Sequence, residues 1–583
     1  MNNNARVFLW LGLVLVLWLN YEAWVRDYGP GTAPTAQESG IAGSPTASAP
    51  RLDASIPEAI VMPTPPGEAA VATATSPPSL GERPVELGAS ASSATTPASS
   101  TADNAARTIR VRTDVLDLDI SLQGGELSRA ALLAYPEVKG QPQRVQLFNR
   151  DQAGFYALQT GLAGPAGAER PTHLASFTSD ASSYTLGSGS DELRVPLVWT
   201  NDRGVTVTKT FVFKRGQYRV DLEYSVNNAG REPWEAASYA QLLRDDPAVE
   251  RSMFNVESYA FKGPAFYDGT KYTKLKVDDD PQQFPPFISG GWIAGMQHHF
   301  VSAVVPKTDT PYRYSLKLDG RQYLLTVAGP LQTVAPGATE VFSETLFVGP
   351  KLQAQLETAG PRLDLVADYG MLTILSRPLF TGLEFVHNAT GNWGWAIVLI
   401  TALLKLLFYP LSETSGKSMA KMRVLAPRIK NLQDTYKDDR EKLGKAMMEM
   451  YQREKINPLA GCLPILIQMP VFFAFYWVLL ESVEMRQAPF IGWIQDLSAK
   501  DPFFILPVVM AGAMFIQFKL NPTPPDPIQA KVFMILPLVM SATFAFFPAG
   551  LVLYWVTNTI LSIAQQWNIN RRIEAAAALA KAG

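Results

Sequence analysis

The sequence predicts an α-helical membrane bundle of six spans, five of which form a core, joined to an all-β sandwich domain outside the cytoplasm. The last third of the 583 residues contains five apolar runs of 17 to 19 residues, close to the minimum length for crossing a ~30 Å hydrocarbon core. A long middle segment alternates apolar and polar residues with a period of two, which is typical of half-buried strands. The first two of the five runs are separated by a strongly basic loop.

Composition excludes several classes of protein. A formal net charge of −2 gives no indication of nucleic-acid binding. Because Cys462 is the only cysteine, neither a disulfide within the chain nor a cysteine metal cluster can form. No cofactor and no metal site are predicted.

Residues 1–28 are predicted to be a membrane anchor. Arg6 precedes an apolar run at 7–19, which a cleaved signal peptide would also show. No small-x-small cleavage site follows, however, and Tyr21 and Trp24 suit a membrane interface. An uncleaved anchor is therefore favoured.

Residues 29–106 are dominated by Pro, Ala, Ser, Thr and Gly and contain almost no aromatic residue. Such a segment buries too little apolar surface to offset the entropy lost on ordering. We predict a disordered linker.

Residues 107–350 predict the antiparallel β-sandwich. The segments 205–213 and 218–226 alternate around the sequence Lys-Arg-Gly-Gln at 214–217, which predicts a hairpin. The alternative is a mixed α/β domain, which would need amphipathic helices that this stretch lacks.

Residues 361–390 predict an interfacial helix, because the stretch has helical periodicity, interrupted by Pro378, but is too polar to span. A five-span core follows over residues 391–572. Its apolar runs are 393–409, 462–480, 503–520, 531–547 and 550–566.

Charge predicts the orientation of these spans. Residues 412–461 contain eleven Lys and Arg, whereas 481–502 contain only Arg486 and Lys500. Since basic loops stay in the cytoplasm, both termini are predicted to be cytoplasmic, with a short tail at 573–583, and the β domain lies on the other side.

The basic loop predicts a helical hairpin over 412–456, with helices at 412–436 and 438–455. Its first helix carries Lys417, Lys421, Arg423, Arg428 and Lys430. One interpretation is an orientation signal that also attracts anionic lipid; the other is a docking site for a ribosome or nascent chain. The sequence "SGKS" at 415–418 lacks the first glycine of a phosphate loop, so no nucleotide is predicted.

Polar residues form a stripe on three of the predicted spans. Thr401, Lys405, Tyr409 and Ser412 are spaced by four, four and three residues, as are Tyr554, Asn558, Ser562 and Gln565, so each set shares one helical face. The second core span adds Gln468.

Lys405 allows three interpretations. It lies near the predicted cytoplasmic end, so its amine could reach the interface, and polar stripes also join helices. The third interpretation is a water-filled cavity, which an ionisable residue facing a bundle interior indicates. The acidic residues of this region lie in loops or at interfaces, so a cation here would be available to an external anion.

The C-terminal third resembles a known family. The run "GNWGWAIVLITALLKLLFYPLSETSGKSMAKMRVLAPRIKNLQ", the block "INPLAGCLPILIQMPVFFAFYW" and the segment "FPAGLVLYWVTNTILSIAQQ" are similar to YidC-type membrane protein insertases of the YidC/Oxa/Alb family. The N-terminal anchor, linker and β-sandwich resemble the Gram-negative form. The resemblance implies an inner-membrane protein with a periplasmic β domain.

In that family five helices form a hydrophilic groove that receives nascent membrane proteins. The resemblance therefore implies an insertase and chaperone, not an enzyme, acting alone or with the Sec translocon, with the ribosome and the phospholipid bilayer as further partners. It implies a groove lined by Lys405, Thr401, Gln468, Tyr554 and Trp555, to which the polar stripe of the last span adds Asn558 and Ser562. Many relatives have Arg in place of Lys405 and Tyr in place of Trp555. A solute or ion transporter using the same cavity is the alternative, and a structural scaffold is a third possibility.

Overall fold

The computed structural model describes residues 52–58, 108–150, 154–165, 169–246, 260–277, 284–436, 439–454, 463–520 and 527–582. They belong to two compact units, an N-terminal β domain that ends at residue 367 and a helical unit that begins at residue 368. The anchor predicted at 1–28 and most of the linker predicted at 29–106 lie outside the described residues.

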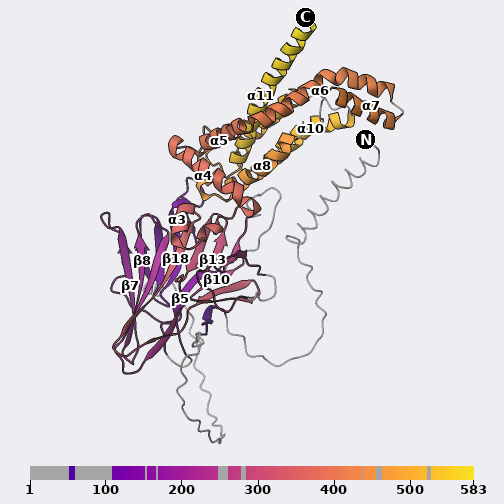
Figure 1. Ribbon diagram of the computed structural model, residues 1–583. Coiled ribbons are helices and arrows are strands. Elements are labelled where there is room, and N and C mark those ends of the chain that lie inside the picture. The colour runs from indigo at the N-terminus through magenta and orange to yellow at the C-terminus, as the bar shows by residue number, and fades with distance from the viewer. Residues whose placement is uncertain are drawn as a thin grey trace, which may run out of the picture. The chain divides into compact units, whose positions relative to one another are not determined.

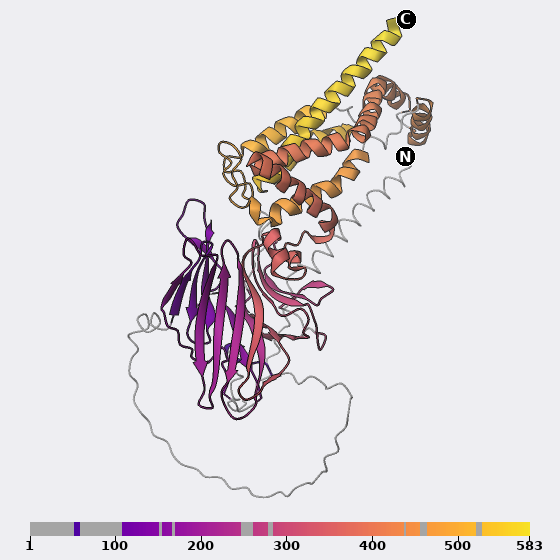
Figure 2. The same ribbon diagram turned by 60° about the vertical axis from the view of Figure 1, so that its left-hand side comes forward.

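The β domain contains two sheets, of ten and eight strands within its described residues. Strands of both sheets are visible in Figure 2. The larger sheet consists of β1 Thr108–Arg112, β2 Leu116–Ser121, β3 Glu126–Pro136, β4 Arg144–Gln146, β5 Tyr156–Ala163, β6 Ser183–Thr185, β10 Trp234–Asp245, β15 Arg313–Asp319, β16 Gln322–Ala328 and β17 Gln332–Val334. The smaller sheet consists of β7 Glu192–Thr200, β8 Val205–Lys214, β9 Arg219–Asn228, β11 Gly263–Tyr267, β12 Tyr272–Lys274, β13 Trp292–Gln297, β14 Phe300–Val305 and β18 Thr339–Pro350.

The predicted hairpin is confirmed, because β8 and β9 pair antiparallel around the turn that follows Lys214. Alternate residues of β9 are buried, as the period of two requires. Polar contacts join the sheets: Tyr156 Oη donates to the carbonyl of Gly295 at 3.4 Å, and Arg244 Nη1 donates to the carbonyl of Met296 at 2.8 Å. The two layers form a sandwich and not the alternative α/β domain.

The linker prediction is wrong for residues 52–58. A 3-10 helix, η1 Leu52–Ala54, and the four residues after it lie on the larger sheet, with Leu52 packed against Leu243 and Leu324. In Figure 1 this is the short indigo segment near β5 and β10. The composition of the whole linker conceals this local segment, which one buried leucine and hydrogen bonds from the sheet hold in place.

The helical unit contains eight α-helices in its described residues. They are α4 Thr373–Thr390, α5 Trp393–Leu407, α6 Tyr409–Thr435, α7 Arg440–Arg453, α8 Leu463–Glu481, α9 Ile505–Leu520, α10 Pro527–Phe544 and α11 Ala549–Ala582. Short 3-10 turns lie at η4 Gly370–Leu372 and η6 Val483–Met485. The β domain ends with α3 Gln353–Ala359 and η3 Leu363–Val366.

Helix α4 begins at Thr373, twelve residues after the predicted start at 361, and it continues through Pro378 without a break. The prediction that Pro378 interrupts the helix is therefore wrong. Phe380 and Leu383 bury one face of α4 in the core of the bundle, whereas Ile374 and Phe385 are 83% and 76% exposed. Packing of that buried face compensates for the hydrogen bond that a proline cannot donate.

Helices α5 and α6 are separated only by Phe408 and differ in direction by 65°. The hairpin predicted to begin at 412 therefore begins three residues earlier. Pro410 lies in the first turn of α6, where a proline is tolerated because the amide there has no helical partner. We call this bend the Phe408 elbow.

The interior of the helical unit is apolar, and so is much of its surface. Phe475, Leu479, Met510 and Leu551 are buried at its centre. Large apolar side chains are also exposed on α5, α9 and α10, such as Leu406, Val508 and Leu538. Such a surface suits lipid better than water.

No single helix among the described residues has both the length and the hydropathy of a membrane span. Helix α5 and the start of α6, residues Trp393–Leu407 and Tyr409–Ser418, have both as a bent pair.

Candidate functional site

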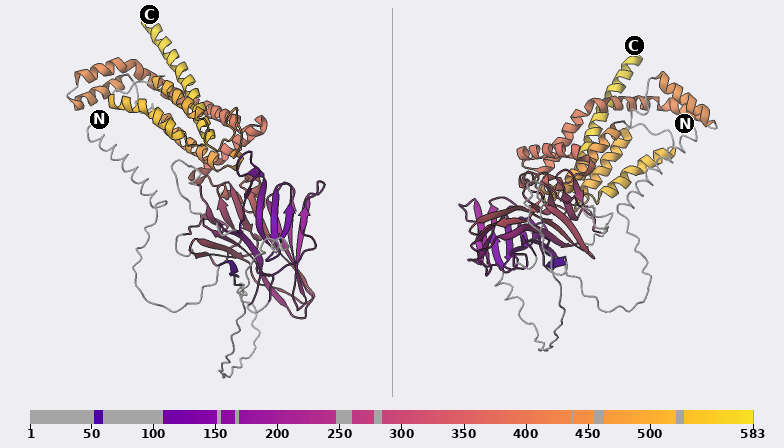
Figure 3. Two further views of the ribbon diagram at one scale, coloured as in Figure 1. Left: turned by 180° about the vertical axis from the view of Figure 1, so that it is seen from behind. Right: turned by 60° about the horizontal axis from the view of Figure 1, so that its bottom comes forward.

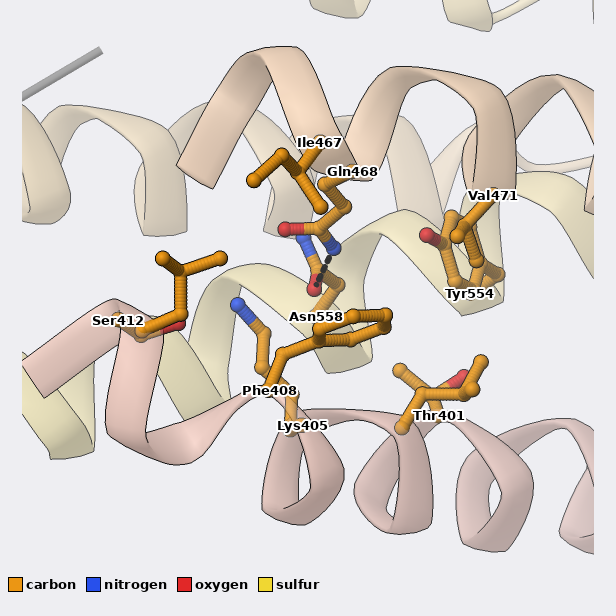
Figure 4. Close-up of a pocket in the computed structure, with 11 residues that line it drawn as sticks. Thr401, Lys405, Phe408, Ser412, Ile467, Gln468, Val471, Tyr554 and Asn558 are labelled. Carbon is orange, nitrogen blue, oxygen red and sulfur yellow. Dashed lines mark hydrogen bonds between the residues drawn. The ribbon is translucent and has the colours of Figure 1, made fainter. Parts of the chain in front are cut away.

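The polar stripes of α5, α8 and α11 meet at one pocket, shown in Figure 4. Its cavity volume is about 20 Å³, enough for roughly one water molecule. The lining residues are Thr401, Leu404, Lys405, Phe408, Leu411, Ser412, Ile467, Gln468, Val471, Tyr554 and Asn558. None of these eleven residues carries a carboxylate.

Lys405 supplies the positive charge of the pocket. In Figure 4 its side chain rises from α5 into the space between the helices. Its Nζ donates a hydrogen bond of 2.7 Å to Ser562 Oγ on α11. Ser562 Oγ in turn donates to the carbonyl of Asn558, also at 2.7 Å. The amine is thus held by a neutral partner that leaves its charge uncompensated.

Gln468 and Asn558 bridge α8 and α11 across the pocket. The amide nitrogen Nε2 of Gln468 donates to Asn558 Oδ1 at 2.6 Å, as the dashed line in Figure 4 shows. Each amide has further donor and acceptor atoms, so the pair can bind polar groups of a second polypeptide as well as each other.

One end of the pocket is closed by tight packing. Thr401 and Tyr554 are 1% and 2% exposed, and the ring of Tyr554 stacks on Phe475 with centroids 4.5 Å apart. Thr401 Oγ1 donates to the carbonyl of Ile397 one turn earlier. These contacts separate the polar lining from the apolar core of the bundle.

Trp555 is placed apart from the other candidate residues. Its ring lies edge-on to Phe472, with centroids 4.9 Å apart, and 5.2 Å from the ring of Phe544. Successive residues of a helix point about a quarter-turn apart, so Trp555 faces the aromatic packing while Tyr554 lines the pocket.

The pocket also has apolar lining residues that the sequence analysis did not name, among them Phe408, Ile467 and Val471. Helical spacing offered a signal, since Phe408 and Val471 lie three residues after Lys405 and Gln468, on the same faces. In the apolar sequence of the spans, however, such residues look like their neighbours that face lipid.

The five basic residues predicted for the docking hairpin do not line this pocket, although Ser412 at the start of α6 does. Helices α6 and α7 run side by side (Figures 1 and 3), joined by a small cluster that includes Leu425, Ile429 and Met447. Lys417 pairs with Glu413 at 2.9 Å, and Arg428 pairs with Glu454 at 3.0 Å. Lys421 and Lys430 are exposed, and Arg423 lies in α6, its side chain outside what the structure describes.

The fold and the pocket define a class of protein. The chain combines a β-sandwich with a bundle of apolar helices that encloses a polar, cationic pocket. This arrangement is typical of a membrane protein that handles polar groups at the level of lipid.

Comparisons with known proteins define the family. The profile described as YidC periplasmic domain matches residues 108–382, and the profile described as 60Kd inner membrane protein matches residues 385–576. The chain is 44% identical to the membrane protein insertase YidC of Thioalkalivibrio sulfidiphilus, over 98% of this chain and 99% of that protein. It is 43% identical to the membrane protein insertase YidC of Nitrosococcus oceani, again over 98% and 99%.

The chain belongs to the YidC family of inner-membrane proteins with a periplasmic domain. Among solved structures, a YidC insertase crystal structure with its first transmembrane domain resolved matches 79% of this chain and 92% of its own, with 19% identity and a TM-score of 0.36.

Proposed function

We propose that the pocket of α5, α8 and α11 receives the hydrophilic segment of a nascent membrane protein while the apolar segment of that protein passes into lipid. The activity is that of a membrane protein insertase, as its relatives are named. The observation that carries the proposal is an amine with a neutral hydrogen-bond partner in a pocket whose described lining holds no carboxylate. The transporter alternative finds no support among these relatives.

The interaction energies favour weak, transient binding of the nascent membrane protein, here called the client. Placing an Asp at the centre of a membrane helix costs roughly 2.5–3.5 kcal/mol. An ion pair at 4 Å contributes about 1 kcal/mol in water and about 4 kcal/mol at an effective dielectric constant of 20. Lys405 can therefore offset the cost of an acidic group only where the pocket is partly dry. Even then, the desolvation of both charges reduces the gain, which suits release of the client.

We infer the remaining arrangement from charge. Six spans with both termini in the cytoplasm place the basic hairpin at the cytoplasmic face, where Lys421 and Lys430 can meet a ribosome or anionic lipid. The protein acts alone or beside the Sec translocon. Support comes from the eleven basic residues of 412–461 and from the exposure of these two lysines.

Reconstitution into liposomes tests the proposal. The purified protein should integrate a short client with an acidic tail without ATP, measured as protease protection of the tail. A transporter would instead move solute, and a scaffold would do neither. Replacing Lys405 with Glu should reduce integration of the acidic-tailed client, whereas Lys405→Arg should preserve it because the charge remains. Equal integration by both variants would refute the charge mechanism.

A further inference from the structure

The outer face of the larger sheet of the β domain carries a polar site that binds peptide backbone. Gln159 on β5, Gln241 on β10 and Thr326 on β16 lie side by side in register. Gln241 Nε2 donates to Gln159 Oε1 at 2.9 Å, and Thr326 Oγ1 donates to Gln241 Oε1 at 3.4 Å. Both glutamines are buried. Successive side chains of a strand point to opposite faces of the sheet. Gln241 therefore points away from the smaller sheet, which Arg244, three residues later on β10, contacts.

Residues 52–58 occupy this site, and the sheet contacts them mainly through main-chain carbonyls. Gln241 Nε2 donates to the carbonyl of Ser55 at 2.9 Å, and Gln159 Nε2 donates to the carbonyl of Asp53 at 3.4 Å. Lys317 Nζ adds a bond of 3.0 Å to Ser55 Oγ. Main-chain carbonyls are common to every polypeptide, so these bonds recognise a backbone more than a particular sequence.

His173 provides a third donor to the same backbone. Its Nε2 lies 3.0 Å from the carbonyl of Asp53, and its Nδ1 lies 2.7 Å from Tyr239 Oη. A carbonyl can only accept, so Nε2 of the neutral ring carries the proton and donates it to Asp53. Nδ1 then accepts from the hydroxyl of Tyr239, which also accepts from the amide of His173. Burial lowers the pKa of His173, which favours this neutral form.

One apolar contact sets the register of the bound segment. Leu52 is buried against Leu243 and Leu324, with Phe155 beside them. Ile56, four residues later, is 42% exposed. The site therefore selects a large aliphatic residue followed by carbonyls one and three residues further along the chain.

We propose that this face is a binding site for short segments of other polypeptides that adopt the same 3-10 turn. The chain's own residues 52–58 occupy the site and are displaced from it by such a segment. The occupant is a segment with a large aliphatic residue at its first position and no bulky group over the two carbonyls. Displacement is feasible because a second polypeptide can make the same packing with its own aliphatic side chain and accept the same bonds with its own carbonyls. In an inner-membrane protein with a periplasmic domain, such segments belong to polypeptides emerging outside the cytoplasm.

Peptide binding to the full-length protein in lipid nanodiscs tests this site. The probe is a fluorescein-labelled heptapeptide, LDASIPE, with the sequence of residues 52–58, and fluorescence anisotropy reports its binding. Leu52→Asp should release the chain's own segment and tighten probe binding about ten-fold. In the unaltered protein residues 52–58 compete with the probe for the site and lower its apparent affinity. Ile56→Asp is the matched control and should bind the probe as the unaltered protein does.

Three further measurements examine the site and its selectivity. Adding Gln241→Ala to Leu52→Asp should remove most of the gained affinity, and thermal unfolding checks that the β domain stays folded. A second probe, LAASAPA, keeps the leucine and the backbone but loses the other large or acidic side chains, and it should bind the Leu52→Asp protein nearly as well as LDASIPE. A third probe with Asp in place of Leu should not bind.

Three results would overturn the proposal. Equal probe binding by Leu52→Asp and the unaltered protein would mean that residues 52–58 do not compete for the site. No binding of either leucine peptide would mean that the site takes no free polypeptide. Binding of LDASIPE but not of LAASAPA would restrict the site to an intramolecular clamp.

Discussion

Lys405 on α5 and Ser562 on α11 are joined by a hydrogen bond of 2.7 Å from the ammonium to the hydroxyl. The partner is neutral, so the bond fixes the position of the amine without cancelling its charge. A carboxylate at the position of the Ser562 hydroxyl would hold the amine more strongly and would also neutralise its charge. This difference allows a direct test of whether the free charge matters.

Ser562→Asp should place a carboxylate beside the ammonium of Lys405 and reduce insertion of an acidic-tailed client by about ten-fold, because an ion pair inside the pocket competes with the client. Insertion of a client with a neutral tail should change little. Ser562→Ala is the control that removes the hydroxyl without adding charge. Liposome protease protection measures all three, and an unchanged rate for Ser562→Asp would exclude charge attraction by Lys405.

Reversing the two exposed lysines of α6, by Lys421→Glu and Lys430→Glu together, should weaken cosedimentation of the protein with ribosomes. The loss should be largest at low salt, because exposed charges are screened beyond ~10 Å at 0.1 M ionic strength. Lys445→Glu makes a similar reversal on α7, where Lys445 pairs with Glu441, and serves as the control. Ribosome binding that is equal for all variants in neutral-lipid nanodiscs would leave lipid attraction as the role of the hairpin.

Gly394→Ala should destabilise the helical unit by roughly 1–3 kcal/mol, the usual cost of overpacking. A Cβ at Gly394 would overlap the ring of Phe490, including its Cβ and Cγ atoms, so the ring cannot simply rotate away. Gly512→Ala is the control, since a Cβ at that helical glycine meets nothing within 4 Å. Thermal unfolding in detergent should separate the two variants, and equal melting temperatures would contradict this packing.

Glu344 should make the stability of the β domain depend on pH. Burial raises the pKa of Glu344 from 4.5 to about 7, while Lys209 opposes the shift. Because the folded state then binds the proton more tightly, the stabilising contribution is complete below pH 4.5 and is lost as pH rises through 7. The change amounts to about 3 kcal/mol.

Hydrogen exchange of β18 between pH 4.5 and 7, corrected for the intrinsic exchange rate, measures this loss. Glu344→Gln should remove the dependence, because an amide does not titrate. Lys209 is also buried, and its pKa is lowered to about 7. Its contribution to the stability of the β domain therefore changes only above pH 7, where it increases with pH, opposite to that of Glu344. An unaltered protein with flat exchange below pH 7 would show that the buried carboxyl does not titrate there.

Period and spacing were sufficient to predict much of this structure. Alternation around Lys214 predicted the β8–β9 hairpin, since strand burial with a period of two is a local property of the sequence. Helical spacing placed Lys405, Gln468 and Asn558 on three faces, and these faces meet at one pocket. Which helices are neighbours could not be read from spacing, and that knowledge came from the family resemblance.

Features that depend on contacts between distant segments were missed. Leu52 lies in a stretch whose composition indicates disorder, and only its fit against Leu243 and Leu324 orders it. The continuity of α4 through Pro378 depends in the same way on core packing of Phe380 and Leu383. Trp555 could not be separated from Tyr554 by motif alone, because both rings contact Phe472 and only Tyr554 lines the pocket.

Residues of α6 lie at very different distances from the Phe408 elbow. Helix α6 has 27 residues and therefore extends about 40 Å from the bend, whereas Ser412, which lines the pocket, lies within one turn of it. A swing of about 10° would carry the far end through roughly 7 Å and Ser412 through less than about 1 Å. Any rotation at the elbow would therefore move the far end of α6 several times further than the pocket wall.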